Sequence, residues 1–344
     1  MTGPIAFVVV FGSLVFIHEL GHFLAARLAG VKVEEFGFGF PPRLATLGTW
    51  RGTTISLNWL PIGGFVRLAD ESSPGPDSLA SKGRWTRIMV HSAGALMNLV
   101  LAFLLFSATY LFGTLVQVDE PGAGVLMVAP GSPAEEAGLQ PYDNILEVAG
   151  EPIDSSEEVV TLIQERLGQP TEFVIEREGE VLAPVTITPR ENAPENEGAV
   201  GISLHMPFAR RSYPVWEAVP MGLRATAITV ENIVWAIQAA IRRQFDLQLT
   251  GVIGIYTMTA QAAETGIVRL MQFAASLSVN LFLLNLLPLP ALDGGKLVFI
   301  ALEFLRGGKR VAPEKEGLVH AIGMVLLLAL MVVITVVDYM RYIG

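Results

Sequence analysis

The sequence predicts an α-helical polytopic membrane protein with about four transmembrane helices, a membrane-associated β-hairpin region and an inserted β-rich domain outside the membrane. Four long apolar stretches each approach the length that a helix needs to cross the roughly 30 Å core of a bilayer. Charged side chains make up only 16% of the 344 residues, against about 25% in an average soluble domain. The acidic side chains gather in residues 115–200, which hold 18 acidic and 3 basic residues.

The four apolar stretches are residues 4–28, 88–116, 270–289 and 318–337. Pro288 and Pro290 break the third stretch at its end, because proline cannot continue the helical hydrogen-bond ladder. The first stretch lacks the basic start of a signal peptide and carries His18, Glu19 and His22 in its apolar run. We therefore expect it to be a retained span.

Basic residues predict the orientation of these spans, since lysine and arginine favour cytoplasmic loops. Residues 27–87 hold 8 basic side chains and residues 296–317 hold 5. Both loops are therefore expected to face the cytoplasm, with the acidic domain and both termini outside. Residues 225–241 are apolar but contain Glu231, and we expect an interfacial helix there. A fifth span is the alternative, but it would invert the basic loop near residue 310.

Two regions show strand patterns. Residues 31–40 and 53–60 alternate or are β-branched, and their aromatic content predicts a sheet that dips toward the membrane. Within 117–192 we expect strands at 124–128, 144–149, 172–177 and 181–188, a helix at 157–167, and a short helix that starts at Ser132.

Composition excludes several classes of function. The chain has no cysteine, which excludes disulfides and thiolate metal sites. A pI near 5.1 argues against nucleic acid as a partner, because binding a polyanion requires a basic face. The mean hydropathy of +0.50 makes the lipid bilayer the expected environment.

The first span carries an HExxH motif, His18-Glu19-Leu20-Gly21-His22. Residues i and i+4 share one face of a helix, so both imidazoles can reach one metal ion while Glu19 stands beside them as a general base. Ionisable groups within a span are costly to bury, which makes this cluster a functional-site hypothesis. The alternative is a polar contact between helices.

A catalytic zinc needs a third protein ligand. Asp293 follows the proline-broken third stretch and is the preferred candidate, although it could instead cap the next helix. His91 and His320 lie near span ends and His205 lies in the outer linker, so these are weaker candidates.

These motifs together resemble the site-2 protease family of intramembrane zinc metallopeptidases, and in particular the bacterial regulator-of-sigma-E protease type. The resemblance rests on HExxH in the first span and on Asn-x-x-Pro-x-Pro-x-Leu-Asp-Gly, residues 285–294, after a late span. Residues 36–39, 60–66, 93–98 and 250–255 add further matches. One departure is Ala95, where the family usually has proline.

The resemblance implies specific roles. His18, His22 and Asp293 would bind Zn²⁺, and Glu19 would be the general base. Asn285 would face the substrate, and the β region with Gly63 and Gly64 would hold the substrate in extended form.

Residues 117–192 are similar to a PDZ domain on the stretches 130–139 and 143–150. Such a domain binds peptide termini at a sheet edge. One such domain is visible, where the best-known relatives have two in tandem. The expected organisation is a membrane core at 1–116, the PDZ domain at 117–192, a linker with the interfacial helix at 193–265, and a second membrane core at 266–344.

The expected activity is hydrolysis of the transmembrane segments of single-span membrane proteins, such as an anti-sigma factor or a remnant signal peptide. The expected location is the inner membrane of a bacterial cell, with the active site open toward the cytoplasm. Two other classes of function remain as alternatives. A PDZ adaptor with a vestigial site is opposed by the intact motif, and a zinc transporter is opposed by the single intramembrane cluster.

Overall fold

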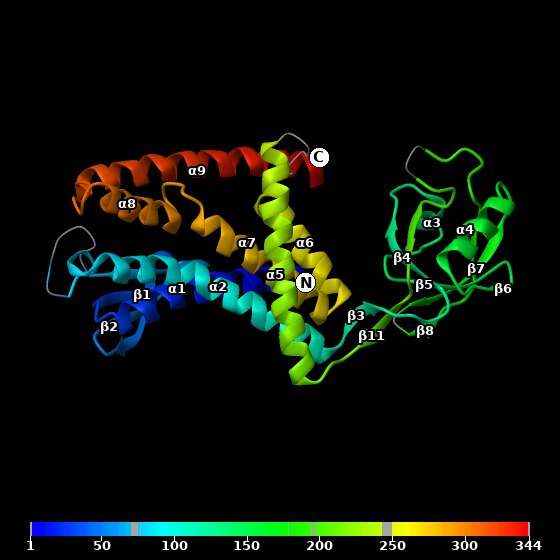
Figure 1. The fold of residues 1–344 in the computed structure, drawn as a ribbon, viewed down its shortest axis with the longest axis horizontal. Coiled ribbons are helices and arrows are strands. Elements are labelled where there is room, and N and C mark those ends of the chain that lie inside the picture. Colours follow the sequence, from blue (N-terminus) through cyan, green and yellow to red (C-terminus); the bar gives the residue numbers. More distant parts are fainter. Residues whose placement is uncertain are drawn as a thin grey trace. The chain divides into compact units, whose positions relative to one another are not determined.

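The computed structural model describes residues 2–69, 75, 77–177, 179–194, 197–242 and 250–342 (Figure 1). The chain divides into two units. One unit consists of Met1–Thr109 with Val215–Gly344, and the other of Tyr110–Pro214. The first unit holds the long apolar helices and a sheet, and the second holds the remaining strands.

Four helices of the described residues are long and apolar enough to cross a membrane. They are α1 (Thr2–Leu28), α2 (Arg84–Phe112), α7 (Ile267–Leu286) and α9 (Pro313–Tyr342). Each corresponds to one of the four predicted apolar stretches.

The ends of two predicted spans were wrong. The second stretch was expected to stay apolar and helical to residue 116, but α2 ends at Phe112 and β3 (Thr114–Gln117) follows. Gly113 between them has a φ of +93°, a left-handed backbone conformation. Glycine adopts this conformation without the steric strain that a side chain causes, so it commonly ends a helix. The third stretch was expected to reach residue 289, but α7 ends at Leu286, ahead of the two prolines.

The predicted hairpin region is one sheet made of β1 (Val33–Trp50) and β2 (Thr53–Leu68). Both strands bend, so that four segments pair. Residues 35–38 pair on one side with 54–57 and on the other with 64–67, while 43–50 pair with 53–58. Residues 63–68 therefore form one edge of this sheet. Glu35 lies buried among these segments and pairs with both Arg43 and Arg67.

Two shorter helices also belong to the first unit. The helix α8 (Asp293–Leu305) follows the loop after α7, and α6 (Val252–Thr265) packs mainly on α1. The carboxylate of Asp338 on α9 accepts hydrogen bonds from the backbone N–H groups of Gly251 and Gly254 at the start of α6. A buried side chain of the last helix thus caps a helix that carries no cap of its own.

The region expected to hold an interfacial helix forms α5 (Val215–Ile241), which begins ten residues earlier than expected and includes Pro220. It runs across the direction of the long helices in Figure 1 and does not qualify as a span among the described residues. Ala225, Val230 and Ile233 pack against a buried cluster from α2 and α7. Trp235 stays 65% exposed.

The second unit is β-rich, as expected. Its larger sheet has the order β10–β4–β5–β7–β8, with β6 on β5 and β9 on β7. The strands are β4 (Ala123–Val128), β5 (Asn144–Val148), β6 (Glu151–Pro152), β7 (Thr171–Arg177), β8 (Glu180–Val181), β9 (Val185–Ile187) and β10 (Ile202–His205). Two helices, α3 (Pro133–Glu136) and α4 (Ser156–Glu165), begin at serine caps, Ser132 and Ser155.

Two pairings lie beyond the expected 117–192 range. The strand β10 pairs with β4, and β11 (Phe208–Arg211) pairs with β3. His205, expected in a linker, lies in β10. Inside this unit the buried carboxylate of Asp143 accepts hydrogen bonds from Arg177, which raise the pKa of that guanidinium.

Candidate metal centre

The HExxH motif lies in the second half of α1, where it was expected. Its two histidines are one turn apart on one face of the helix, and both side chains are largely buried. That face lies against α2 at Gly94. A Cβ added to Gly94 would lie 2.8 Å from Nε2 of His18, closer than real Cβ contacts come. Glycine at this position therefore lets α2 approach the two imidazoles.

Asp293 reaches the same place from the first residue of α8. The chain leaves α7 at Leu286 and turns through a short loop, in which Ala291 has a φ of +76°. The backbone N–H of Ala291 donates to Nδ1 of His320 at 2.9 Å, which holds this loop. Asp293 is the first residue of α8 and meets the two histidines. The alternative that Asp293 caps this helix was wrong, because the N-cap is Leu292 and no side chain makes a cap hydrogen bond there.

The three donor atoms form a nearly equilateral triangle. Oδ2 of Asp293 lies 3.1 Å from Nε2 of His18 and 3.1 Å from Nε2 of His22, and the two Nε2 atoms are 3.2 Å apart. Ligands about 2.0–2.1 Å from a tetrahedral zinc ion are about 3.3 Å from one another. The triangle therefore fits three ligands of such an ion and leaves the fourth position open.

The hydrogen bonds of the two Nδ1 atoms determine whether Nε2 of each histidine can bind a metal ion. Nδ1 of His22 lies 2.8 Å from the carbonyl oxygen of Val90, which can only accept, so this nitrogen donates and Nε2 carries the lone pair. Nδ1 of His18 lies 3.3 Å from Nδ2 of Asn98, while Oδ1 of the same amide is buried and has no partner among the described residues. With that amide turned so that Oδ1 accepts from Nδ1, Nε2 of His18 also offers its lone pair.

Two lone pairs and a carboxylate oxygen converging in a buried space repel one another unless a cation binds between them. This donor set suits zinc, which binds imidazole nitrogen and carboxylate oxygen. Among the described residues, these three are the group with metal-ligand geometry.

Glu19 points to a different neighbour, the edge of the β1–β2 sheet. The backbone N–H of Val66 donates to its carboxylate, and a Cβ added to Gly64 would lie 3.5 Å from its Cγ. Glu19 is therefore adjacent to the ligands along the chain but is not part of the triangle. This placement leaves its carboxylate available for proton transfer.

The remaining predicted site residues lie in the β1–β2 sheet and in α7. Gly63 and Gly64 belong to the edge segment 63–68 of the sheet, where Gly64 pairs with Phe38. Asn285 is half-buried in the last turn of α7, one residue before that helix ends. The structure shows no contact between Asn285 and the ligand triangle.

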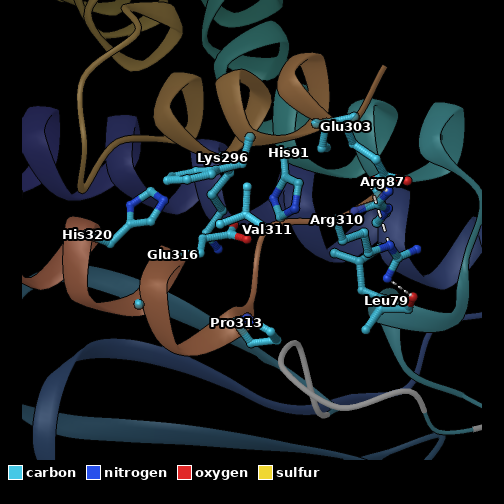
Figure 2. Close-up of a pocket in the computed structure, with 14 residues that line it drawn as sticks. Leu79, Arg87, His91, Lys296, Glu303, Arg310, Val311, Pro313, Glu316 and His320 are labelled. Carbon is cyan, nitrogen blue, oxygen red and sulfur yellow. Dashed lines mark hydrogen bonds and ion pairs between the residues drawn. The ribbon is translucent and has the colours of Figure 1, made fainter. Parts of the chain in front are cut away.

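The alternative histidines are outside the triangle. His91 and His320 line a separate cavity of about 580 Å³ between α2, α8 and α9 (Figure 2). Figure 2 shows Lys296 and Glu316 in the same cavity, and Glu303 there pairs with both Arg87 and Arg310. His205 lies in the other unit, in β10.

The sequence did not predict the groups that contact the Nδ1 atoms of the two histidines. Asn98 was noted only as part of a family-like stretch, although a polar amide in the middle of an apolar span is itself a signal. The carbonyl of Val90 carries no sequence signal, because any residue type supplies it.

The chain belongs to peptidase family M50, whose family model matches residues 6–330. It is therefore a metalloprotease of the site-2 type. It is 32% identical to the zinc metalloprotease RasP of Geobacillus kaustophilus and 32% identical to the regulator of sigma-W protease RasP of Bacillus subtilis, in both cases over 98% of each chain. It is 30% identical to the zinc metalloprotease RasP of Oceanobacillus iheyensis over 99% of each chain.

A solved structure also matches in part. The PDZ domain of an SdrC-like protein from Listeria monocytogenes aligns with 26% of this chain and 93% of that domain, at 23% identity and a TM-score of 0.23.

Proposed function

We propose that this metalloprotease cleaves single-span membrane proteins within or beside the bilayer, with His18, His22 and Asp293 as zinc ligands. The observation that carries the proposal is the triangle of three donor atoms 3.1–3.2 Å apart, placed in a helix long and apolar enough to span a membrane. A zinc ion held there supplies the Lewis acidity that activates water and polarises a peptide carbonyl.

Glu19 is the proposed general base. Its carboxylate takes a proton from the attacking water and gives it to the leaving amine, so that one group serves both steps. The hydrogen bond from the backbone of Val66 orients this carboxylate toward the sheet edge. Such an arrangement places the base beside the proposed position of the substrate backbone.

The edge segment 63–68 is the proposed substrate platform. A transmembrane helix has internally bonded carbonyls, so it must unwind before water can attack one of them. Unwound backbone in a membrane needs replacement hydrogen bonds. Residues 64–67 pair with β1 on one side, and their other edge can supply these bonds to an added strand.

The name of one relative supports a substrate class. One relative is named as a regulator of sigma-W, which makes a single-span anti-sigma factor the first substrate to test, with remnant signal peptides as the second. The PDZ-like unit is proposed to lie outside the cytoplasm and to bind peptide termini. Its strand β10 is a terminal strand of the sheet and offers a free edge for that purpose among the described strands.

A comparison of membrane proteomes tests this function. Cells that carry Glu19→Gln in place of the wild-type chain should accumulate single-span fragments that the wild-type cells remove. The variant should keep its zinc, because Glu19 is not a ligand. Loss of a general base typically costs 10²–10⁴-fold in rate. Identical membrane fragments in both strains, with the variant expressed and loaded with zinc, would contradict the proposal.

A further inference from the structure

A second cavity lies directly beside Glu19. Its volume is about 360 Å³, and it is lined by α1 on one side and by the β1–β2 sheet on the other. Val8, Gly12 and Phe16 line it from the helix, and Phe38, Leu57 and Gly63 line it from the sheet. Apart from Glu19 and Ser13, the side chains that line it are apolar, so the cavity suits an apolar group.

Aromatic rings give this cavity fixed walls. Phe16 stacks on Phe38 with ring centroids 5.3 Å apart and meets Phe36 edge to face at 5.7 Å. Such contacts restrain the three rings relative to one another. One part of the cavity wall is therefore built from aromatic rings that pack against one another.

Gly12 sets the size of this space. It lies inside α1, yet a Cβ added there would meet no atom within 4 Å. Glu19 is seven residues further along, two turns on the same face of the helix and about 10 Å away along the axis. Because Gly12 lines the cavity and leaves room for a Cβ, a larger side chain there would occupy part of the cavity.

We propose that this cavity binds the large aliphatic or aromatic side chain of a substrate residue next to the scissile bond, and that Gly12 determines the size accepted. The inference rests on the proposed proteolytic function. A strand added to the edge segment 63–68 directs alternate side chains to opposite faces of the sheet. One residue near the reacting carbonyl then points toward α1, where this cavity and Glu19 lie together.

Substitution of Gly12 tests the proposal. Leucine is a better helix former than glycine, so Gly12→Leu should fold and keep its zinc. The matched control is Gly317→Leu, since Gly317 also lies in a long helix with no atom within 4 Å of an added Cβ and is outside this cavity. The probe is a single-span substrate whose cut has been mapped by mass spectrometry, prepared with Ala, Leu or Phe at each position that flanks the cut.

At one flanking position, Gly12→Leu should lower kcat/KM for the Leu and Phe substrates by about 10–200-fold relative to the Ala substrate, the range typical for a changed apolar pocket. Gly317→Leu should keep the preference of the wild type. An equal effect of Gly12→Leu on all substrates, or no effect, overturns the inference while the proteolytic function stands. Failure of the wild-type chain to cut any substrate overturns both.

Cross-linking supplies a readout that does not depend on cleavage. The chain has no cysteine, so Gly12→Cys in a Glu19→Gln background introduces a single thiol. This thiol should form a disulfide with a cysteine placed at the same flanking position of the substrate, whereas a control at Leu24, an exposed position of α1 outside the cavity, should not. Equal cross-linking at both sites, or none at Gly12, would overturn the inference.

Discussion

The amide of Asn98 lies 3.3 Å from Nδ1 of His18, on the side of the ring away from the three converging ligand atoms. Asn98 is fully buried in α2, and the hydroxyl of Ser278 on α7 donates to its backbone carbonyl at 2.7 Å. Its position is therefore held by two helices. With the amide turned so that Oδ1 rather than Nδ2 faces the ring, Asn98 accepts from Nδ1, which keeps the proton on that nitrogen and leaves Nε2 free to bind the metal.

Replacing Asn98 should weaken zinc binding selectively. Asn98→Leu removes the acceptor and should lower zinc affinity by about 10–100-fold, the usual effect of losing a group that orients a ligand. Asn98→Asp keeps an oxygen at the same place and should retain most of the affinity. Competition with a chromophoric chelator measures both, and the visible spectrum of the Co²⁺-substituted protein reports the geometry. Equal affinity of the Leu and Asp variants would contradict the proposed role.

Zinc content should depend on all three ligands. The purified chain should hold about one zinc ion, and His22→Ala or Asp293→Ala should reduce this occupancy strongly, because two remaining ligands no longer define a tetrahedral site. His205→Ala is the control, since His205 lies in β10 of the other unit. Metal analysis of detergent-purified protein provides the measurement. Full zinc occupancy in Asp293→Ala would mean that another residue completes the site.

Membrane topology can be tested with single thiols. Cysteine introduced at Glu157 in α4 should react with an impermeant reagent from outside the cell, because the PDZ-like unit is expected there. Cysteine at Thr49 in β1, or at Lys309 between α8 and α9, should react only after the membrane is opened. All three positions are exposed, so burial does not confound the result. Reaction of Lys309→Cys from outside would favour α5 as a fifth span.

Removal of the PDZ-like unit should spare the metal centre. Gln117 of β3 pairs directly with Phe208 of β11, so residues 118–207 can be replaced by Asn-Gly, the preferred two-residue hairpin turn. This deletion removes no ligand, no general base and no candidate span. Zinc content should persist, and an already shortened substrate should still be cut, while the choice among full-length substrates changes. A zinc-loaded deletion that cuts no substrate would show that the unit takes part in catalysis.

The sequence predicted those elements whose characteristic residues lie within one short stretch of the chain. Apolar length and the HExxH spacing located α1, and apolar length located α7, although not its end. Asp293 was found because its position after a broken span, together with the motif around it, pointed to the same chemistry. In each case, residues near one another in sequence carried the information.

The features that were missed depend on residues distant in sequence. The sheet was expected as two short strands, but residues 35–38 pair with two different segments, a register that no single stretch encodes. The helix α6 was not expected either, since its start is capped by Asp338, more than eighty residues later. The support of His18 by Asn98 joins two helices and likewise leaves no local pattern.

The junction at the PDZ-like unit also bears on how such chains evolve. The strands β3 and β11 pair where the chain enters and leaves this unit, and the N–H of Tyr213 donates to the carbonyl of Tyr110 one step closer to the helices. Entry and exit therefore lie next to each other. A gene can gain, lose or duplicate a domain at this point while the ends of α2 and α5 keep their separation, so the specificity of the protease can diverge while its catalytic core is inherited unchanged.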